Sequence, residues 1–207
     1  LFVKGDSSDN TWEEIQRVAE AYKETHNIRF AKQDGKGKGD AVRKGFAMAE
    51  KDILMILDAD ITVPPEDLPR FYHAIVDRRA EFVNGSRLFY PLEDKAMRFF
   101  NILGNKFFAM AFSFVLSRPL KETLCGTKVL TPENYEKLAS NRNYFGDFDP
   151  FGDFDLLFGA ARMGLKIVEV PIHYKARTYG DTNIQRWKHG MVLLRMLLFA
   201  ARRIKFL

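Results

Sequence analysis

The sequence contains a single cysteine, Cys125, among its 207 residues. One cysteine excludes an intramolecular disulfide framework and fits a reducing compartment, so we expect the thiol to be buried as a small apolar group. Histidine is also scarce, with 4 residues, and no second histidine or cysteine stands at zinc spacing from His173. We therefore assign no zinc site. No apolar run reaches the length of about 20 residues that a membrane-spanning helix needs.

Acidic residues are outnumbered, with 27 Asp+Glu against 32 Lys+Arg, which gives a net charge of +5. This balance suits an anionic partner, but it does not distinguish nucleic acid, a phosphorylated substrate and an acidic membrane. With 46% hydrophobic and 29% charged residues, the composition is that of a globular domain large enough to bury a core.

An apolar run at residues 53–57 ends in two carboxylates, Asp58 and Asp60. Such a run predicts a strand buried on both faces, as at the centre of a mostly parallel sheet. If the strand continues through Asp60, the alternation of side chains puts both carboxylates on the same side. Hard oxygen ligands at the carboxyl end of a strand favour Mg²⁺ or Mn²⁺, bound together with the phosphates of a ligand. Two solvated aspartates that open a turn are the alternative.

Strands and helices alternate along the chain. We expect strands at residues 1–3, 28–31, 53–57, 81–87 and 165–170, with helices between them, and a loop that enters a strand at 122–129. We also expect a long apolar helix at 95–116 that is either core or an interfacial face. This order predicts an α/β fold with a doubly wound, mostly parallel sheet flanked by helices. The glycine-lysine loop at 33–40 could offer backbone N–H groups and lysine charge to a phosphate, or could be a flexible solvated loop.

Seven segments form a pattern over nearly the whole chain: SSDNT (7–11), GKGDAVRKG (37–45), LDADITVPPEDL (57–68), VNGSR (83–87), ETLCGTKVL (122–130), DFDLLFGAARMGLKIVEVPIHY (153–174) and RTYGDTNI (177–184). In this order and spacing they resemble the family-two glycosyltransferases of GT-A fold. The resemblance is strongest to the branch similar to dolichyl- or polyprenyl-phosphate sugar synthases.

The resemblance implies inverting transfer of a sugar from a nucleotide-diphosphate sugar to a lipid-linked phosphate, with no nucleic-acid partner. Asp58 and Asp60 match the metal-binding DxD motif, with Asp60 as the direct ligand. The implied catalytic residues are Asp60, Glu122, Arg87 and Arg177, the two arginines being suited to bidentate phosphate contacts. The residues implied to bind the donor and its metal are Asp9, Lys36, Gly37, Asp58, Ala59 and Asp60.

Three features depart from the family pattern. The family begins with a strand and an acidic loop that hold the nucleoside, and here that first strand is absent, as in an N-terminally truncated domain. Lys4 stands where an acidic residue normally contacts the base, so the nucleotide is not named by the sequence. Glu122 stands where many relatives have an aspartate near the acceptor. An inactive or binding-only fragment of such a domain is therefore an alternative function.

A second alternative uses the same aspartates. The segment from Asp58 to Thr62 fits the DxDxT nucleophile motif of haloacid-dehalogenase-type phosphatases, in which Asp58 would be phosphorylated. That family places the motif on its first strand, whereas two expected strands precede it here. We therefore prefer the glycosyltransferase hypothesis.

The C-terminal segment, residues 185–207, is basic, and no acidic residue occurs after Asp181. At about 100° per residue, Lys188, Arg195, Arg202 and Arg203 lie along one side of a helix that is otherwise largely apolar. We expect residues 1–184 to form the glycosyltransferase domain and 185–207 to lie on an anionic membrane surface. The protein would then be cytoplasmic and peripheral on the inner face of the membrane. Packing of the apolar face as ordinary core is the alternative.

Overall fold

The computed structural model describes residues 1–5, 7–87, 99–141, 154–175 and 186–205. These residues form two compact units, which are described separately. Unit 1 holds the described residues up to Asp52, and unit 2 holds the described residues from Ile53 onward.

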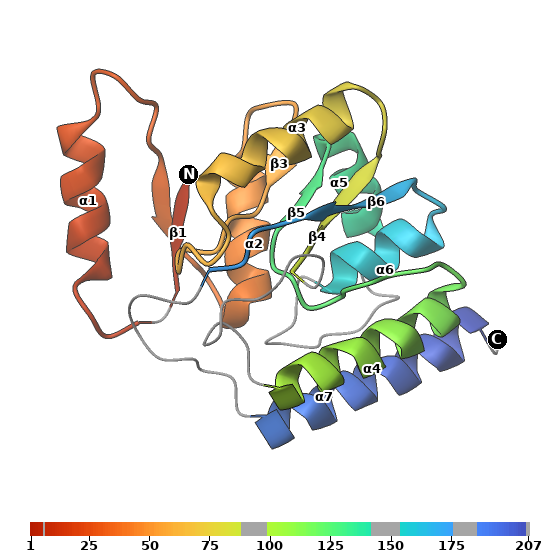
Figure 1. The fold of residues 1–207 in the computed structure, drawn as a ribbon. Coiled ribbons are helices and arrows are strands. Elements are labelled where there is room, and N and C mark those ends of the chain that lie inside the picture. Colours follow the sequence, from red (N-terminus) through yellow and green to blue (C-terminus); the bar gives the residue numbers. More distant parts are fainter. Residues whose placement is uncertain (6, 88–98, 142–153, 176–185, 206–207) are drawn as a thin grey trace. The chain divides into compact units, whose positions relative to one another are not determined.

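Unit 1 is a pair of parallel strands with two helices. Its elements are β1 (Phe2–Lys4), α1 (Thr11–Ala21), β2 (Phe30–Lys32) and α2 (Gly37–Met48). The ring of Trp12 on α1 meets Phe30 of β2 edge to face at 5.3 Å. Gly45 of α2 lies against β1, because a Cβ there would be 3.4 Å from a methyl group of Val3. The two helices lie on opposite sides of the strand pair (Figure 1).

Unit 2 contains a four-stranded sheet with the order β3-β5-β4-β6. Its strands are β3 (Leu54–Met55), β4 (Phe82–Ser86), β5 (Lys128–Leu130) and β6 (Ile167–Pro171). β3, β4 and β6 run in one direction, and β5 runs in the opposite direction between β3 and β4. The expected α/β fold with a mostly parallel sheet is confirmed. The apolar run at 53–57 was wrongly expected to be a strand throughout, because only two of its residues pair as strand.

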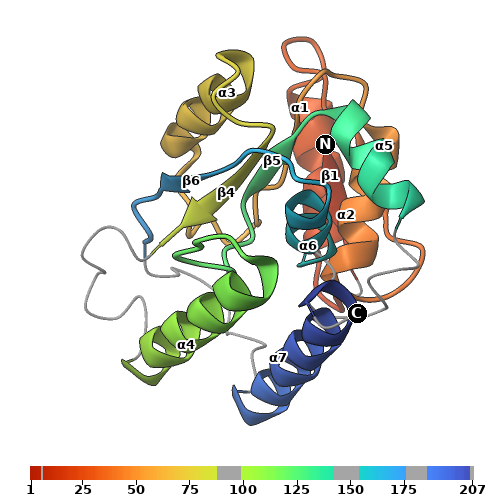
Figure 2. The ribbon, with the colours of Figure 1, turned by 90° about the vertical axis from the view of Figure 1, so that its right-hand side faces the viewer.

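Helices cover both faces of this sheet. They are α3 (Leu68–Val76, after a 3₁₀ turn at Pro65–Asp67), α4 (Phe99–Leu116), α5 (Pro132–Ser140), α6 (Phe154–Arg162) and α7 (Arg186–Ala200, continued by a π-helical segment Ala201–Lys205). α3 lies on one face of the sheet and α6 on the other. α4 packs against α6, and α7 runs beside α4 (Figures 1 and 2).

Each face of the sheet has its own apolar cluster. Val83, Val129 and Cys125 are buried with Phe71 and Ile75 of α3. On the other side, the rings of Phe112, Phe154 and Phe158 lie with their centroids 5.2 to 5.7 Å apart. The expectation that Cys125 is a buried apolar group is confirmed, and burial raises the pKa of its thiol.

One side of the long helix α4 is part of the core, and another side is exposed. Ala109, Phe112 and Val115 are buried, whereas another line of large apolar side chains is between 50% and 68% exposed. This exposed line consists of Leu103, Phe107, Met110 and Phe114. In the described part of the chain, no helix is long and apolar enough to cross a membrane.

Helix α7 has the same division. Leu193, Met196 and Ala200 are buried, which agrees with the alternative that part of its apolar surface is core. Met191, Leu194 and Leu198 are exposed. We refer to the exposed apolar residues of α4 and α7 together as the two-helix surface.

Candidate active site

Four loops of unit 2 meet at one edge of its sheet. β3, β4 and β6 all end at this edge, and because β5 runs in the opposite direction, the residues that precede β5 lie there as well. Asp58 and Asp60 follow β3, Arg87 follows β4, Tyr174 follows β6 and Glu122 precedes β5. This is the edge at which open α/β sheets bind ligands.

The two aspartates after β3 are placed by a turn. Ile61 donates its backbone N–H to the carbonyl oxygen of Asp58 at 3.3 Å. Oδ1 of Asp60 accepts hydrogen bonds from the backbone N–H and the hydroxyl group of Thr62, at 3.2 and 2.9 Å. The expected continuation of the strand through Asp60 is therefore wrong, because the chain turns at Ala59 and Asp60 and the alternation of a strand does not apply.

Ile61 marks strain in this turn. Its φ angle is +52°, which is unfavourable for a β-branched residue, and its side chain is 44% exposed, so apolar packing does not hold it there. Such a conformation costs on the order of 1–3 kcal/mol and persists only where neighbouring contacts fix it. The hydrogen bonds from Thr62 to Asp60 supply those contacts, which supports a functional role for the geometry of this turn.

A buried ion pair lies at the same edge of the sheet as the turn. One carboxylate oxygen of Glu122 accepts the backbone N–H of Arg87 at 2.6 Å, and the other accepts Nε–H of the same arginine at 2.6 Å and also binds Nη2. The Glu122 side chain is fully buried and that of Arg87 is 14% exposed. Burial alone would lower the pKa of Arg87, but the Glu122 carboxylate raises it, so the arginine remains charged.

The segment after β6 connects this ion pair with the aspartate turn. The guanidinium group of Arg87 lies over the ring of Tyr174, 5.2 Å from its centroid. The next residue, Lys175, donates its backbone N–H to the carbonyl oxygen of Thr62 at 3.0 Å. Thr62 in turn binds Asp60, so the two halves of the candidate site are held by one short stretch of chain.

Two further expectations concern this segment. Arg177 lies outside the described residues, so its predicted phosphate contact stays a prediction. His173 was expected to be a structural strand residue and not a ligand; it lies just after β6, and the role of its side chain stays a prediction. Its backbone N–H donates to Oδ2 of the buried Asp67 at 2.9 Å, and Oδ1 of Asp67 also binds Arg70 at 2.7 Å.

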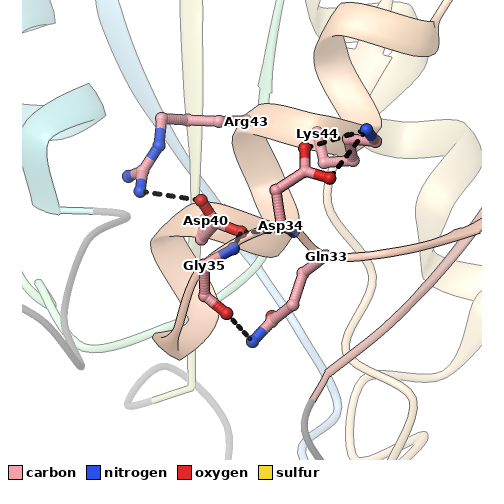
Figure 3. Close-up of polar contacts among 6 residues, drawn as sticks. All are labelled: Gln33, Asp34, Gly35, Asp40, Arg43 and Lys44. Atoms are coloured by element: carbon pink, nitrogen blue, oxygen red, sulfur yellow. Dashed lines mark hydrogen bonds and ion pairs between the residues drawn. The ribbon is translucent and has the colours of Figure 1, made fainter.

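In unit 1, the glycine-lysine loop is ordered by one carboxylate. Oδ2 of Asp40 accepts the backbone N–H groups of Asp34 and Gly35 at 3.0 and 2.7 Å, as Figure 3 shows. Lys36 is the extended residue before α2, and Gly37 begins the helix with a φ of +78°, which glycine adopts without strain. The N-terminus of α2 therefore follows a loop of fixed shape, as an anion-binding loop requires.

Asp9 has a local role at the start of α1. Its Oδ1 accepts the backbone N–H of Thr11 at 3.2 Å and its hydroxyl group at 2.6 Å, and these bonds lower the pKa of Asp9. Nearby, Lys4 donates from Nζ to the carbonyl oxygen of Ser7 at 2.6 Å. Binding of the donor by Asp9, Lys36 and Gly37 stays a prediction.

The role of Asp40 gives a prediction about acid stability. The N–H of Gly35, and secondarily Arg43, lower the pKa of Asp40 below its usual value of 3.8. The stabilisation by the carboxylate is thus present above that value and is lost as the pH falls through the lower pKa of the folded state. We expect Asp40→Asn to lower the melting temperature at pH 7. Between pH 4 and pH 3, the melting temperature of this variant should fall less than that of the unaltered protein.

Asp34→Asn is the control for this experiment. Asp34 is on the same loop, but it makes an exposed ion pair with Lys44, which is worth less than about 1 kcal/mol. Equal melting curves for the two variants at every pH would contradict the role of Asp40.

Residues 1–143 match the sequence model of Glycosyl transferase family 2. The chain belongs to this family. A dolichol-phosphate mannosyltransferase of Pyrococcus furiosus is 30% identical over 189 residues, which are 89% of this chain and 50% of that protein. A dolichyl-phosphate hexose transferase of Haloferax volcanii is 28% identical over 188 residues, 91% of this chain and 75% of that protein. The chain thus spans half the length of the first of these relatives.

Solved structures agree on the fold of this family 2 domain. Glucosyl-3-phosphoglycerate synthase from Mycobacterium tuberculosis, in complex with Mn²⁺, UDP and glucosyl-3-phosphoglycerate, matches with a TM-score of 0.66 and 18% identity, over 99% of this chain and 68% of that chain. At this identity the similarity concerns the fold alone, and it confirms the expected GT-A fold. Membership of family 2 also favours the glycosyltransferase hypothesis over the phosphatase hypothesis.

Binding of a divalent cation by Asp58 and Asp60 stays a prediction. Among the described residues, no group of three or more histidine, cysteine, aspartate or glutamate side chains could hold a metal ion by itself. In the predicted site, Asp58 and Asp60 would supply carboxylate oxygens, and the phosphates of a donor would supply further ligands. This division of ligands is typical of Mg²⁺ sites in proteins that bind nucleotide phosphates.

Three residues of the candidate site were not identified from the sequence. Tyr174 contacts Arg87, Asn84 donates from Nδ2 to the backbone oxygen of Glu122 at 2.8 Å, and Glu169 accepts the backbone N–H of the same residue at 3.0 Å. Asn84 and Glu169 lie inside expected strands. The sequence of a strand does not indicate which loop a polar side chain on it will contact. The one available signal was that Asn84 lies in VNGSR, a short segment of the family pattern that also contains Arg87.

Proposed function

We propose that this domain transfers a sugar, with inversion, from a nucleotide-diphosphate sugar to the phosphate group of a polyprenyl or dolichyl phosphate. The observation that carries the proposal is the buried pair of Arg87 and Glu122 at the same sheet edge as the turn of Asp58 and Asp60. An arginine suited to binding phosphate thus lies at the same sheet edge as carboxylates that suit a metal and a diphosphate. The names of the Pyrococcus and Haloferax relatives support the acceptor class.

The chemistry is a single displacement. An oxygen of the acceptor phosphate attacks the anomeric carbon, the bond from that carbon to the donor diphosphate breaks, and the nucleoside diphosphate leaves with the electron pair. A phosphate monoester has a second pKa near 6 and is already an anion at pH 7, so no strong general base is required. Attack opposite to the leaving group inverts the configuration of the anomeric carbon.

The residues have separate roles in this step. Asp58 and Asp60 would hold a divalent cation, Mg²⁺ or Mn²⁺, which when bound neutralises charge on the diphosphate. Arg87 would hold the acceptor phosphate. Glu122 occupies Nε and Nη2 of Arg87, and within the described residues Nη1 donates no hydrogen bond. Glu122 would therefore orient the arginine instead of accepting a proton from the acceptor.

A transfer assay tests the proposed function. The protein would be incubated with Mg²⁺ or Mn²⁺, a panel of nucleotide-diphosphate sugars and a short-chain polyprenyl phosphate, and the products would be identified by mass spectrometry. A parallel reaction would contain 3-phosphoglycerate, because the Mycobacterium synthase was solved with glucosyl-3-phosphoglycerate. A glycosylated polyprenyl phosphate supports the proposal. Donor binding without transfer to either acceptor would favour the binding-only alternative.

A polyprenyl acceptor also requires access to a membrane. The two-helix surface exposes apolar side chains, and Arg195, Arg202 and Arg203 are exposed on α7 and the segment that continues it. Apolar residues combined with basic residues are the composition of an interfacial surface that binds anionic lipid. We therefore propose peripheral membrane association, with the exposed apolar residues of α4 adding to those of α7.

Vesicle sedimentation measures this association. We expect the intact chain to sediment with anionic vesicles at low salt, and the Arg195, Arg202 and Arg203→Glu variant to stay in the supernatant. Replacing Phe107, Met110 and Phe114 with serine should also weaken binding, because buried apolar area contributes about 25 cal/mol per Å². Tyr72→Ser, an exposed aromatic residue on α3, is the control. An intact chain that remains in the supernatant would rule the membrane surface out.

A further inference from the structure

Three polar side chains form a row across the sheet of unit 2. Asn84 of β4 is paired with Lys128 of β5 on one side and with Glu169 of β6 on the other. Paired residues of neighbouring strands point to the same face, and here it is the face opposite to Val83, Val129 and the core beneath α3. Lys128 and Asn84 are fully buried, which is unusual for a lysine.

Each member of this row binds the backbone of the loop that carries Glu122. Nζ of Lys128 donates to the carbonyl oxygen of Cys125 at 2.6 Å, and Nδ2 of Asn84 donates to that of Glu122 at 2.8 Å. The carboxylate of Glu169 accepts the N–H groups of Lys121, at 2.9 and 3.0 Å to its two oxygens, and of Glu122, at 3.0 Å. The backbone of Glu122 is thereby held at both its N–H and its carbonyl oxygen.

We propose that Glu169 is a positioning residue for the acceptor phosphate, and that it acts through Glu122 and Arg87. The proposal rests on the proposed function, because it assumes that Arg87 binds the phosphate. Glu169 fixes the backbone of Glu122, and the Glu122 carboxylate fixes the guanidinium plane of Arg87 with its Nε and Nη2 contacts. A guanidinium group binds phosphate through two parallel N–H bonds, so the orientation of its plane determines the contact.

Glu169→Gln tests this chain of contacts. A glutamine has one acceptor oxygen, and its NH₂ group would face an N–H donor of the loop, so the loop should move and Arg87 should turn. Glu81→Gln is the matched control. Its carboxylate also accepts a backbone N–H, that of Lys166 at 2.8 Å, and it lies on the same pair of strands but at the end of β4 away from the site.

Two measurements are needed, and the first does not depend on sugar transfer. The Nε–H resonance of Arg87 would be recorded by ¹H–¹⁵N NMR and assigned by its absence in the Arg87→Lys protein. We expect Glu169→Gln to shift this resonance and Glu81→Gln to leave it unchanged. An unchanged resonance in Glu169→Gln would overturn the proposal. If Glu169→Gln does not fold, Glu169→Asp, which keeps the charge but shortens the side chain, replaces it in both measurements.

The second measurement is kinetic. We expect Glu169→Gln to lower kcat/KM for the polyprenyl phosphate by about tenfold, with the Kd of the nucleotide sugar unchanged. Loss of one hydrogen bond to a charged group changes a rate or binding constant by about this factor. Equal losses for donor and acceptor, or equal effects of Glu169→Gln and Glu81→Gln, would overturn the proposal. If the unaltered protein glycosylates no phosphate acceptor, the proposed function fails, whereas the NMR result still decides whether Glu169 positions Arg87.

Discussion

Sugar transfer by the Asp60→Asn protein should fall by about 100-fold or more, which is the effect of removing one electrostatic stabiliser of a transition state. Asparagine keeps the Oδ1 atom that accepts the two hydrogen bonds of Thr62, so the turn should survive. The substitution removes the negative charge, which a hard divalent cation requires. The measurement is the rate of transfer as a function of Mg²⁺ or Mn²⁺ concentration, with circular dichroism as the check on folding.

Two further variants make this result specific. Asp58→Asn should impair transfer, to a smaller extent than Asp60→Asn. Asp77→Asn, which removes an exposed carboxylate paired with Arg79 on the surface, should leave the rate unchanged. Normal turnover of Asp60→Asn would refute the metal assignment. A phosphoaspartate trapped at Asp58, with Asp58 alone essential, would instead revive the phosphatase hypothesis.

The second large effect is expected at Arg87. Arg87→Ala should raise the KM of the acceptor phosphate about tenfold or more and leave the donor Kd nearly unchanged, because a bidentate charged contact is lost. It should also lower the free energy of unfolding by about 3–5 kcal/mol, because it leaves the fully buried carboxylate of Glu122 without its partner. Urea unfolding measures the stability, and donor titration with acceptor kinetics measures the binding.

A double variant separates the two consequences. Arg87→Met combined with Glu122→Gln removes both charges, and such replacements of buried ion pairs are often neutral for stability. We expect its unfolding free energy to return toward that of the unaltered protein, while use of the acceptor stays impaired. Glu133→Gln is the control, because its pair with Lys137 is exposed to solvent and should contribute little to stability. A double variant that transfers sugar normally would show that Arg87 has only a structural role.

The sequence by itself determined those features that depend on neighbouring residues. The spacing of apolar residues along the chain located most of the strands and helices, because it shows which face of a helix or strand can be buried. The carboxylates after the apolar run lie beyond the carboxyl end of β3, as their place in the sequence predicted, and the family resemblance was confirmed by the match of residues 1–143. Cys125 was correctly expected to be buried, because a lone cysteine behaves as a small apolar residue.

Contacts between residues far apart in the chain were decided only by the tertiary structure. Glu122 contacts Arg87, 35 positions earlier in the chain, because β5 runs antiparallel to β3 and β4. The pattern of apolar residues did not indicate this strand direction. The turn at Asp60 depends on a positive φ angle at Ile61, which sequence reasoning would not assign to a β-branched residue. Glu169 and Asn84 act on a loop more than 35 residues away, so their roles depend on the pairing register of three strands. Spacing within one strand predicts which face each side chain takes, but it does not identify the paired residue on a distant strand, because the partner strands are brought together only when the chain folds.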